Sequence, residues 1–344
     1  MVKNVTLVVD DQDKAINYLC PSKKQTATGY YNNTRTTIDN VSCGSSGWFQ
    51  YTFQGTGIRV IAVALQSHSY SVKIDDGAFE DQSGGGYFES PILPDGQHTL
   101  TYAVGDLDAV PMLDYLTVTP GPSTQLMGQS LVVDDSDDIL TFSGKWSTSA
   151  PRGFPSNTTN NLYQGTSHWS STVGDSFQFQ FAGTSVSLYG ALFNAVIKNI
   201  SLSFVINGVP IPTTISNSTL DTVPFVQLFH TDLQTGNQTV VVNIMDISSE
   251  QAVGFDLITY NANFNNLASM PTFGPSAIIA ARIRKSHVGA ICGGIVGLVL
   301  VIVALIVGFK MSRNSPDSSS KPRASSEESW ASGRSSKRRR SSAS

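Results

Sequence analysis

The chain contains the same series of sequence blocks twice before residue 262, and this duplication constrains the fold more than any other feature. The paired blocks are residues 7–13 (LVVDDQD) and 131–137 (LVVDDSD), 49–56 (FQYTFQGT) and 177–184 (FQFQFAGT), 96–100 (GQHTL) and 236–240 (GNQTV), and 113–118 (LDYLTV) and 255–260 (FDLITY). Because the order is kept while the spacing grows along the chain, the pattern indicates one repeated module with insertions in its loops.

Both copies show the two-residue periodicity of β-strands. In residues 49–53 aromatic residues alternate with Gln and Thr, and residues 177–181 repeat this alternation, as half-buried antiparallel strands require. Asp76-Gly77 and Asn207-Gly208 each follow a further strand-like run and are strong hairpin signals. Many short strands without a convincing amphipathic helix predict an all-β fold, with one antiparallel β-sandwich for each copy.

The repeated motifs also resemble those of a known family. An opening VDD, then F-x-[FY]-x-F-x-G-T, I-[DN]-x-G or ING, G-x-H-T-L and a closing [LF]-D-x-[LI] are similar to galactose-binding-like jelly-roll modules. Such modules occur in tandem in fungal single-pass cell-surface membrane proteins with Ser-rich cytoplasmic tails. The resemblance covers residues 5–120 and 129–262, and it implies sandwiches whose end loops bind sugars or other cell-wall ligands. Modules of this family bind many different ligands, so the fold does not identify the ligand.

A membrane span is predicted near the C-terminal end. Residues 288–309 contain no charged residue, and a helix of this length crosses a hydrocarbon core of about 30 Å. Within it Gly289, Gly293 and Gly297 lie on one helix face. This G-x-x-x-G pattern favours a homodimer through the span, although glycine is also common in membrane helices generally.

Potential N-glycosylation sites orient the chain in the membrane. All of them precede the span, at Asn4, Asn32, Asn40, Asn157, Asn199, Asn217 and Asn237. Met1 is not followed by an apolar signal segment, so either a signal peptide is missing or the front part stays in the cytosol. The one-sided sequons favour the first alternative. We therefore expect a plasma-membrane protein with extracellular N-terminal domains and a cytoplasmic tail.

These predictions divide the chain into five segments. They are a first sandwich (1–121), a second sandwich (122–262), a juxtamembrane stalk (263–287), the transmembrane helix (288–309) and a disordered, basic, Ser-rich tail (310–344). In the tail Ser315, Ser325 and Ser342 are candidate phosphorylation sites, since phosphates would reverse its positive charge. The alternative is a solvated stop-transfer tail without a signalling role.

Composition argues against nucleic acid as a partner, but it does not decide whether the cysteines form a disulfide. Charged residues make up 14% of the chain and the formal net charge is −4, with the basic residues concentrated in the tail, so we expect no nucleic-acid binding. Cys20 and Cys43 form a disulfide if the front part is exported, or they remain two thiols.

Clustered aspartates are the strongest candidates for a metal site in the sequence. Carboxylates at close spacing hold Ca²⁺, and the resemblance implies a structural cation between the first and last strands of each module. The candidate ligands are Asp10, Asp11 and Asp114 in the first copy and Asp134, Asp135 and Asp256 in the second. The alternative is that these side chains only accept hydrogen bonds from turn amides. No other cofactor is expected.

Aromatic residues suggest a possible sugar-stacking platform. The candidates are Tyr30, Tyr31, Trp48, Tyr70, Tyr87 and Phe88 in the first copy and Trp146, Tyr163 and Trp169 in the second. Each ring could instead pack in a core.

The sequence shows no zinc, G-x-S-x-G or Walker motif. We therefore expect a non-enzymatic surface protein that binds carbohydrate or cell-wall glycoprotein, for example as a wall sensor. The alternatives are a structural or adhesion glycoprotein without a small ligand and, less favoured, a glycan-active hydrolase.

Overall fold

The computed structural model describes residues 5–38, 47–63, 68–104, 112–155 and 162–273. Over these residues every strand pair is antiparallel and helical structure is limited to short 3₁₀ turns. The prediction of an all-β antiparallel fold is therefore confirmed. The predicted span, its three glycines and the candidate phosphorylation sites lie outside the described residues. In the part that the structure describes, no helix has the length and apolar composition needed to cross a bilayer.

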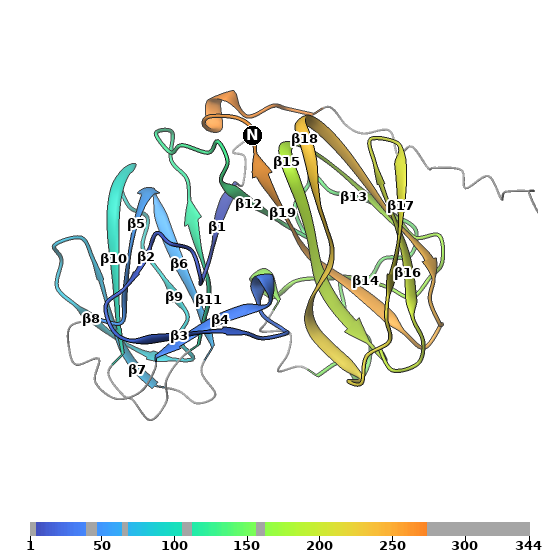
Figure 1. The fold of residues 1–344 in the computed structure, drawn as a ribbon, viewed down its shortest axis with the longest axis horizontal. Coiled ribbons are helices and arrows are strands. Elements are labelled where there is room, and N and C mark those ends of the chain that lie inside the picture. Colours follow the sequence, from blue (N-terminus) through green and yellow to red (C-terminus); the bar gives the residue numbers. More distant parts are fainter. Residues whose placement is uncertain (1–4, 39–46, 64–67, 105–111, 156–161, 274–344) are drawn as a thin grey trace, which may run out of the picture. The chain divides into compact units, whose positions relative to one another are not determined.

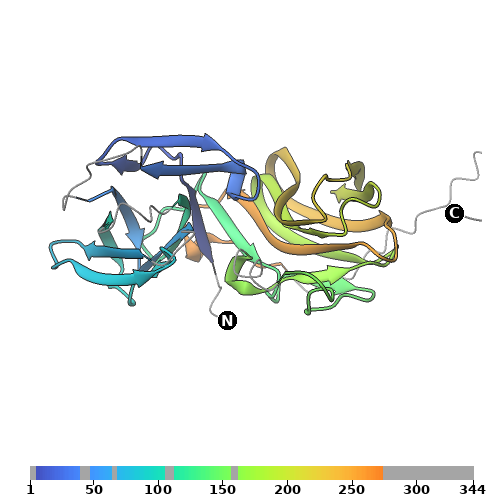
Figure 2. The same ribbon diagram turned by 90° about the horizontal axis from the view of Figure 1, so that it is seen from below.

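The first sandwich consists of eleven strands in two facing sheets (Figures 1 and 2). The strands are β1 (Thr6–Asp10), β2 (Ile16–Tyr18), β3 (Ser22–Thr26), β4 (Thr34–Ile38), β5 (Phe49–Gly55), β6 (Gly57–Val63), β7 (His68–Ile74), β8 (Glu80–Gly84), β9 (Phe88–Glu89), β10 (Gly96–Val104) and β11 (Met112–Thr119). One sheet has the order β2-β5-β10-β7-β8, and in the other β11 pairs with β1, β4 and β6. The 3₁₀ turn η1 (Tyr31–Asn33) precedes β4.

The second sandwich repeats this layout with longer strands. They are β12 (Ser130–Asp134), β13 (Thr141–Ser143), β14 (His168–Ser170), β15 (Ser176–Phe193), β16 (Ile200–Ile206), β17 (Val209–Ile215), β18 (Thr222–Asp246) and β19 (Ala252–Ala262), with the turn η4 (Tyr163–Gly165) before β14. β15 corresponds to β5 and β6 joined end to end. Its first half pairs with the end of β18, and its second half pairs with β19 as β6 pairs with β11.

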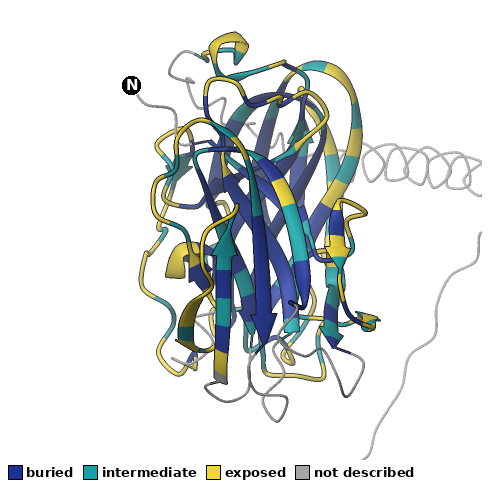
Figure 3. Ribbon diagram, turned by 90° about the vertical axis from the view of Figure 1, so that its left-hand side faces the viewer, coloured by how far each residue is buried: buried dark blue, intermediate teal, exposed yellow. Residues whose placement is uncertain are grey.

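A glycine stands at the same bend in both copies. A side chain on Gly55 would place its Cβ 2.5 Å from the carbonyl oxygen of Thr119, and one on Gly183 would meet that of Asn261 at the same distance. The close backbone approach explains why the repeated F-x-G-T block keeps its glycine. Alternate aromatic residues of this block, such as Phe49 and Phe177, are buried in the core. Figure 3 shows that buried residues concentrate on the strands and exposed residues on the connecting loops.

The two sandwiches are joined through their first strands. β1 pairs with β12 in the register Leu7↔Leu131 and Thr6↔Val132. Leu7 and Leu131 are equivalent residues of the two copies, so this antiparallel pairing defines a local twofold axis between the sandwiches. The connecting segment is also fixed, because Leu126 is fully buried and its N–H donates to Asn265 O at 2.8 Å. Both sandwiches belong to one compact unit.

The segment predicted as the start of a stalk is part of the folded body. Phe264 is buried in the main core, and Leu267, Met270 and Phe273 pack against that core. The turn η5 (Leu267–Ser269) is closed by a capping box between Asn266 and Ser269. The expected stalk boundary at residue 263 is thus corrected, since apolar residues keep 263–273 on the second sandwich.

Candidate functional site

Two acidic clusters occupy equivalent places in the two sandwiches. In the second, Asp134 ends β12, Asp135 follows it and Asp256 lies on β19; all three are buried, and a carboxylate oxygen from each lies within 4.8 Å of the others. The Asp135 N–H donates to Asp256 O at 2.8 Å. In the first sandwich the Asp11 N–H donates to Asp114 O at 3.1 Å. The repeated blocks therefore place aspartates of the first and last strands side by side in each sandwich.

Each cluster holds a 3₁₀ turn in place. The Tyr31 N–H donates to Asp114 Oδ1 at 2.7 Å, and the Thr34 hydroxyl donates to Asp11 Oδ1 at 2.7 Å. In the second copy the Tyr163 N–H donates to Asp256 Oδ1 at 3.0 Å, and the Thr166 hydroxyl donates to Asp135 Oδ1 at 2.6 Å.

The turns reveal a fifth repeated block, Y-x-x-T, that sequence comparison missed. The loops before the two turns differ in length, so the blocks do not align at a fixed spacing from the VDD motif. A shared Tyr-x-x-Thr ahead of a short strand was the signal that could have found them.

The clusters differ at one position two residues beyond the threonine. The Thr36 hydroxyl donates to Asp11 Oδ2 at 2.5 Å. Its counterpart is His168, whose Nδ1 lies 2.5 Å from Asp135 Oδ2 and whose ring stacks on Phe142 at a centroid distance of 4.0 Å. The same carboxylate oxygen is thus engaged by a hydroxyl in one copy and an imidazole in the other.

Burial controls the electrostatics of both clusters. Desolvation raises the pKa of Asp114 and of Asp256 well above the usual range, and it raises the pKa of Asp11 and Asp135 less. Burial and then the neighbouring Asp11 raise the pKa of Asp10 to about 6. Buried carboxylates need either a proton or a compensating cation. The oxygen-only donor set of the second cluster suits a hard cation such as Ca²⁺, and calcium binding there stays a prediction.

Most of the residues predicted to form the sugar-stacking platform are buried, so that part of the prediction is wrong. Six of its members are buried in cores and offer no free ring face: Tyr31, Trp48, Tyr70, Phe88, Tyr163 and Trp169. Tyr70, Phe88 and Trp169 lie on strands with their side chains in the core, whereas Tyr31 and Tyr163 are the buried residues of the turns η1 and η4. Tyr87 differs, since 51% of it is exposed.

Hydrogen bonds fix the position of Tyr87. The buried Tyr70 hydroxyl donates to the Tyr87 carbonyl at 2.5 Å, and the buried Tyr102 hydroxyl donates to Gly86 O at 3.1 Å. The Tyr87 hydroxyl donates to Glu89 Oε2 at 2.8 Å, while Glu89 Oε1 accepts from Arg59 at 2.8 Å. Burial and the bond to Glu89 raise the pKa of Tyr87 to about 12, so its phenol stays protonated. We call Arg59, Tyr87 and Glu89 the Tyr87 platform.

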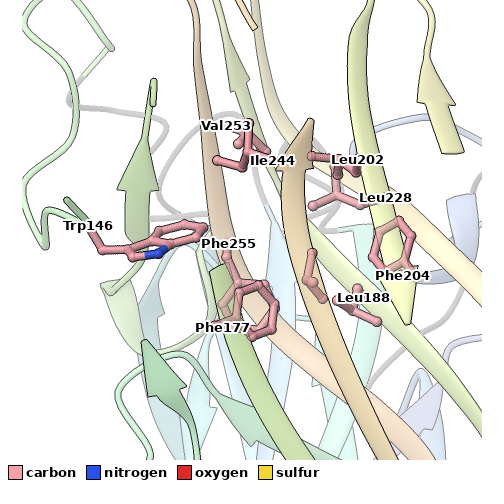
Figure 4. A pocket seen from close by; sticks show the side chains of 10 residues that line it. Trp146, Phe177, Leu188, Leu202, Phe204, Leu228, Ile244, Val253 and Phe255 are labelled. Carbon is pink, nitrogen blue, oxygen red and sulfur yellow. The ribbon is translucent and has the colours of Figure 1, made fainter. Parts of the chain in front are cut away.

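The second sandwich has an apolar pocket where the first has these two core tyrosines. Tyr102 pairs with Phe49, and Val242 pairs with the equivalent Phe177. Leu202 likewise replaces Tyr70, because Tyr70 pairs with Val104 and Leu202 pairs with the equivalent Ile244. Figure 4 shows the result, a pocket lined only by hydrophobic and aromatic side chains with Trp146 at one side. The second sandwich therefore does not repeat the Tyr87 platform.

A serine, a histidine and an aspartate come together on the second sandwich. Ser187 Oγ lies 2.8 Å from His230 Nδ1, and His230 Nε2 lies 3.8 Å from Asp232 Oδ1. The second distance is too long for a hydrogen bond, and the Asp232 side chain is 91% exposed. An aspartate in solvent cannot fix the histidine tautomer as hydrolytic triads require, so this group is best explained as a cross-strand contact.

The remaining predicted sites are placed only in part. Asn32, Asn199, Asn217 and Asn237 are exposed, whereas Asn4, Asn40 and Asn157 lie outside the described residues. Cys20 is disulfide-bonded; Cys43, its predicted partner, also lies outside them, so the pairing itself stays a prediction.

Comparisons with known proteins give distant structural matches. No protein-family model matches the chain, and no curated protein matches its sequence. Similar solved structures include a family two carbohydrate esterase from Cellvibrio japonicus (17% identity, TM-score 0.28, 42% of this chain and 37% of that chain). They also include the CBM36-1 domain of a xylanase from the hindgut metagenome of Trinervitermes trinervoides (14%, 0.27, 42% and 98%) and a CBM36 module in complex with calcium and xylotriose (16%, 0.26, 37% and 96%).

The chain spans only a fraction of the larger matched proteins, 37% of the esterase and 26% of a Paenibacillus xanthan lyase. The sandwich fold of this chain follows from the strand order and register described above.

Proposed function

We propose that this chain is a non-enzymatic, single-pass cell-surface protein that binds neutral carbohydrate, of a cell wall or of a glycoprotein, through its first sandwich. The proposal rests on the Tyr87 platform. An aromatic ring that is exposed yet held by buried partners supplies an apolar face for a sugar ring without ordering a mobile side chain on binding. Arg59 and Glu89 beside it supply polar groups that can fix the orientation of hydroxyls.

The charge of the platform favours a neutral ligand. Arg59 is already paired with Glu89 at 2.8 Å, so it does not present an unpaired positive charge to an acidic sugar.

Membrane attachment and an outside location are parts of the same proposal. The apolar residues 288–309 support the span, and the exposed sequon residues Asn199, Asn217 and Asn237 support glycosylation of this part. A mobility shift on treatment with an N-glycosidase, together with labelling of intact cells by an impermeant reagent, tests both.

A glycan array probed with the detergent-solubilised full chain tests the binding function. Tyr87→Ala should lower affinity for the bound glycan at least about fivefold, because an aromatic contact contributes about 1 kcal/mol. Phe79→Ala is the matched control, since Phe79 is also an exposed aromatic residue, 41% accessible, on the β7–β8 hairpin of the same sandwich.

Equal loss in both variants, or none in Tyr87→Ala, would remove the platform from the proposal. A glycosylated surface chain that binds nothing on the array would instead favour a structural glycoprotein.

A further inference from the structure

The two 3₁₀ turns meet the opposite sandwich at the seam, which we define as the contact around the β1–β12 pair. The Tyr31 ring of the first sandwich lies 5.2 Å from the Tyr189 ring of the second, and the Tyr189 hydroxyl donates to Asn32 Oδ1 at 2.7 Å. Both tyrosines belong to a cluster that also contains Val8 and Val132, one from each of the paired strands.

Tyr163 makes the reciprocal contact. Tyr163 belongs to the same cluster, and Ile61 of the first sandwich packs against that cluster. Ile61 occupies the place of Tyr189 in the repeat, since Ile61 pairs with Tyr115 and Tyr189 pairs with the equivalent Leu257. The local twofold axis therefore places η4 over β6, as η1 lies over β15.

This contact brings η4 to the edge of the Tyr87 platform. Arg59 is two residues before Ile61 on β6 and points to the same face. Because Ile61 packs against the cluster that contains Tyr163, Arg59 lies beside that cluster on the same face of β6. The next residue, Gln164, is exposed and has φ of 54°, so the backbone turns outward directly after the buried tyrosine.

We propose that the carbohydrate site extends across the seam, with the Gln164 side chain of the second sandwich as a further contact for an oligosaccharide bound on the Tyr87 platform of the first. This inference rests on the proposed function and adds the ligand class to it: a neutral chain of several sugar units rather than one terminal sugar. An amide with both donor and acceptor groups suits sugar hydroxyls.

The opposite side of the seam does not offer the same contact. Asn32, the equivalent of Gln164, accepts the Tyr189 hydroxyl at 2.7 Å. Ser187 and His230, which replace Arg59 and Glu89 in the strand pairing, bond to each other at 2.8 Å. Leu228 stands where the first sandwich has Tyr87. The twofold seam thus carries one platform, not two.

The test compares short and long ligands on the full-length chain. The probes are the disaccharide and the hexasaccharide of β-1,3-glucan, β-1,4-glucan and chitin, measured by calorimetry. Gln164→Gly removes the side chain without straining a residue at positive φ. It should weaken hexasaccharide binding about threefold to tenfold, the loss of one hydrogen bond, and leave disaccharide binding unchanged.

Two further variants separate the possible failures. Gln234→Ala, at an exposed glutamine of the same sandwich, should bind both lengths as the wild type does. Tyr87→Ala should weaken both lengths. If Tyr87→Ala weakens binding but Gln164→Gly does not, the proposed contact of Gln164 with the ligand is wrong, and binding on the Tyr87 platform is retained. If no probe binds, or if Tyr87→Ala has no effect, the proposed function itself fails and the seam contact falls with it.

Discussion

At the scale of single residues, the two copies use different side chains to hydrogen-bond the same hairpin turn to its neighbouring strand. Asp75 and Asn207 begin the two hairpin turns at positive φ, and each side chain accepts from a strand amide, that of Thr99 and Thr239 respectively. The second partner is His98 in the first copy and Gln238 in the second. His98 Nδ1 lies 2.7 Å from Asp75 Oδ2, and its Nε2 lies 2.9 Å from Pro94 O. Both nitrogens face acceptors, so the ring is satisfied only when doubly protonated.

The bond between His98 and Asp75 predicts a pH-dependent contribution to stability that one substitution should remove. The bond to Asp75 and then the Pro94 carbonyl raise the pKa of His98 above its ordinary value of 6.5. A raised histidine pKa stabilises the fold fully below 6.5, and this contribution is lost as pH rises through the folded-state value. We expect at most about 1 kcal/mol, because Asp75 is half exposed.

The variant His98→Gln introduces the glutamine of the second sandwich and should reduce the fall in the free energy of unfolding between pH 6 and 8.5, measured by urea titration. An unchanged pH slope would show that His98 is not the titrating group.

Sequence indicated the acidic residues of the clusters but not their partners. Asp11, Asp114, Asp135 and Asp256 stand out because they recur in blocks with the same neighbours. In the sequence Tyr31 is recognisable only as an aromatic residue, and nothing distinguishes Thr34 from other threonines. Their role depends on a turn with left-handed residues, and no periodic pattern in the sequence marks such a turn.

At the scale of elements, the edge strands explain why such a large sheet need not aggregate. The sheet that runs through both sandwiches ends at β3 on one side and at β17 on the other. β3 carries exposed Lys23 and Lys24, and β17 carries Pro210 and Pro212, which lack N–H donors. Charged residues and prolines are the usual means of blocking further strand pairing.

Asp10 of the first sandwich predicts a loss of stability with rising pH that calcium should remove. The pKa of Asp10 is raised to about 6 by burial and by Asp11, above the unfolded value near 3.8. Without a cation, this carboxyl therefore contributes stability that is complete below 3.8 and lost as pH rises through 6. Asp10→Asn, which cannot ionise, should lack this loss, which we expect to be about 1–3 kcal/mol.

Chemical denaturation at pH 4 and pH 7 measures this effect, with EDTA or with millimolar calcium. Calcium should remove the loss in the wild type at pH 7 by neutralising the ionised cluster. Identical free energies with calcium and with EDTA would show that protons alone satisfy these carboxylates.

At the scale of the whole molecule, sequence predicted two modules but not their association. The two-residue periodicity predicts the strands of each copy, and the family resemblance predicts that they form a sandwich. The β1–β12 pair, the buried Leu126 and the packing of Phe264 join segments far apart in the chain. Local pattern contains no information on which face of one module meets the other, and the copies looked like independent domains for that reason.

The seam predicts that the two sandwiches unfold together. Tyr189 is 1% exposed and stacks on Phe225 at 5.3 Å. Its ring also contacts that of Tyr31 in a tilted arrangement at 5.2 Å, and its hydroxyl donates to Asn32. Tyr189→Ala removes a large buried aromatic ring, which costs about 3–5 kcal/mol. The β1–β12 pairing spans only two residue pairs, so the tyrosine cluster should carry much of the coupling.

We therefore expect one calorimetric transition for the wild type and two for Tyr189→Ala, with the first sandwich released from the second. Tyr189→Phe keeps the ring contacts and loses only the bond to Asn32, so it should keep a single transition at a slightly lower temperature. Phe79→Ala, at an exposed ring on the β7–β8 hairpin, controls for loss of aromatic surface. Two transitions already in the wild type would show that the seam does not couple the sandwiches.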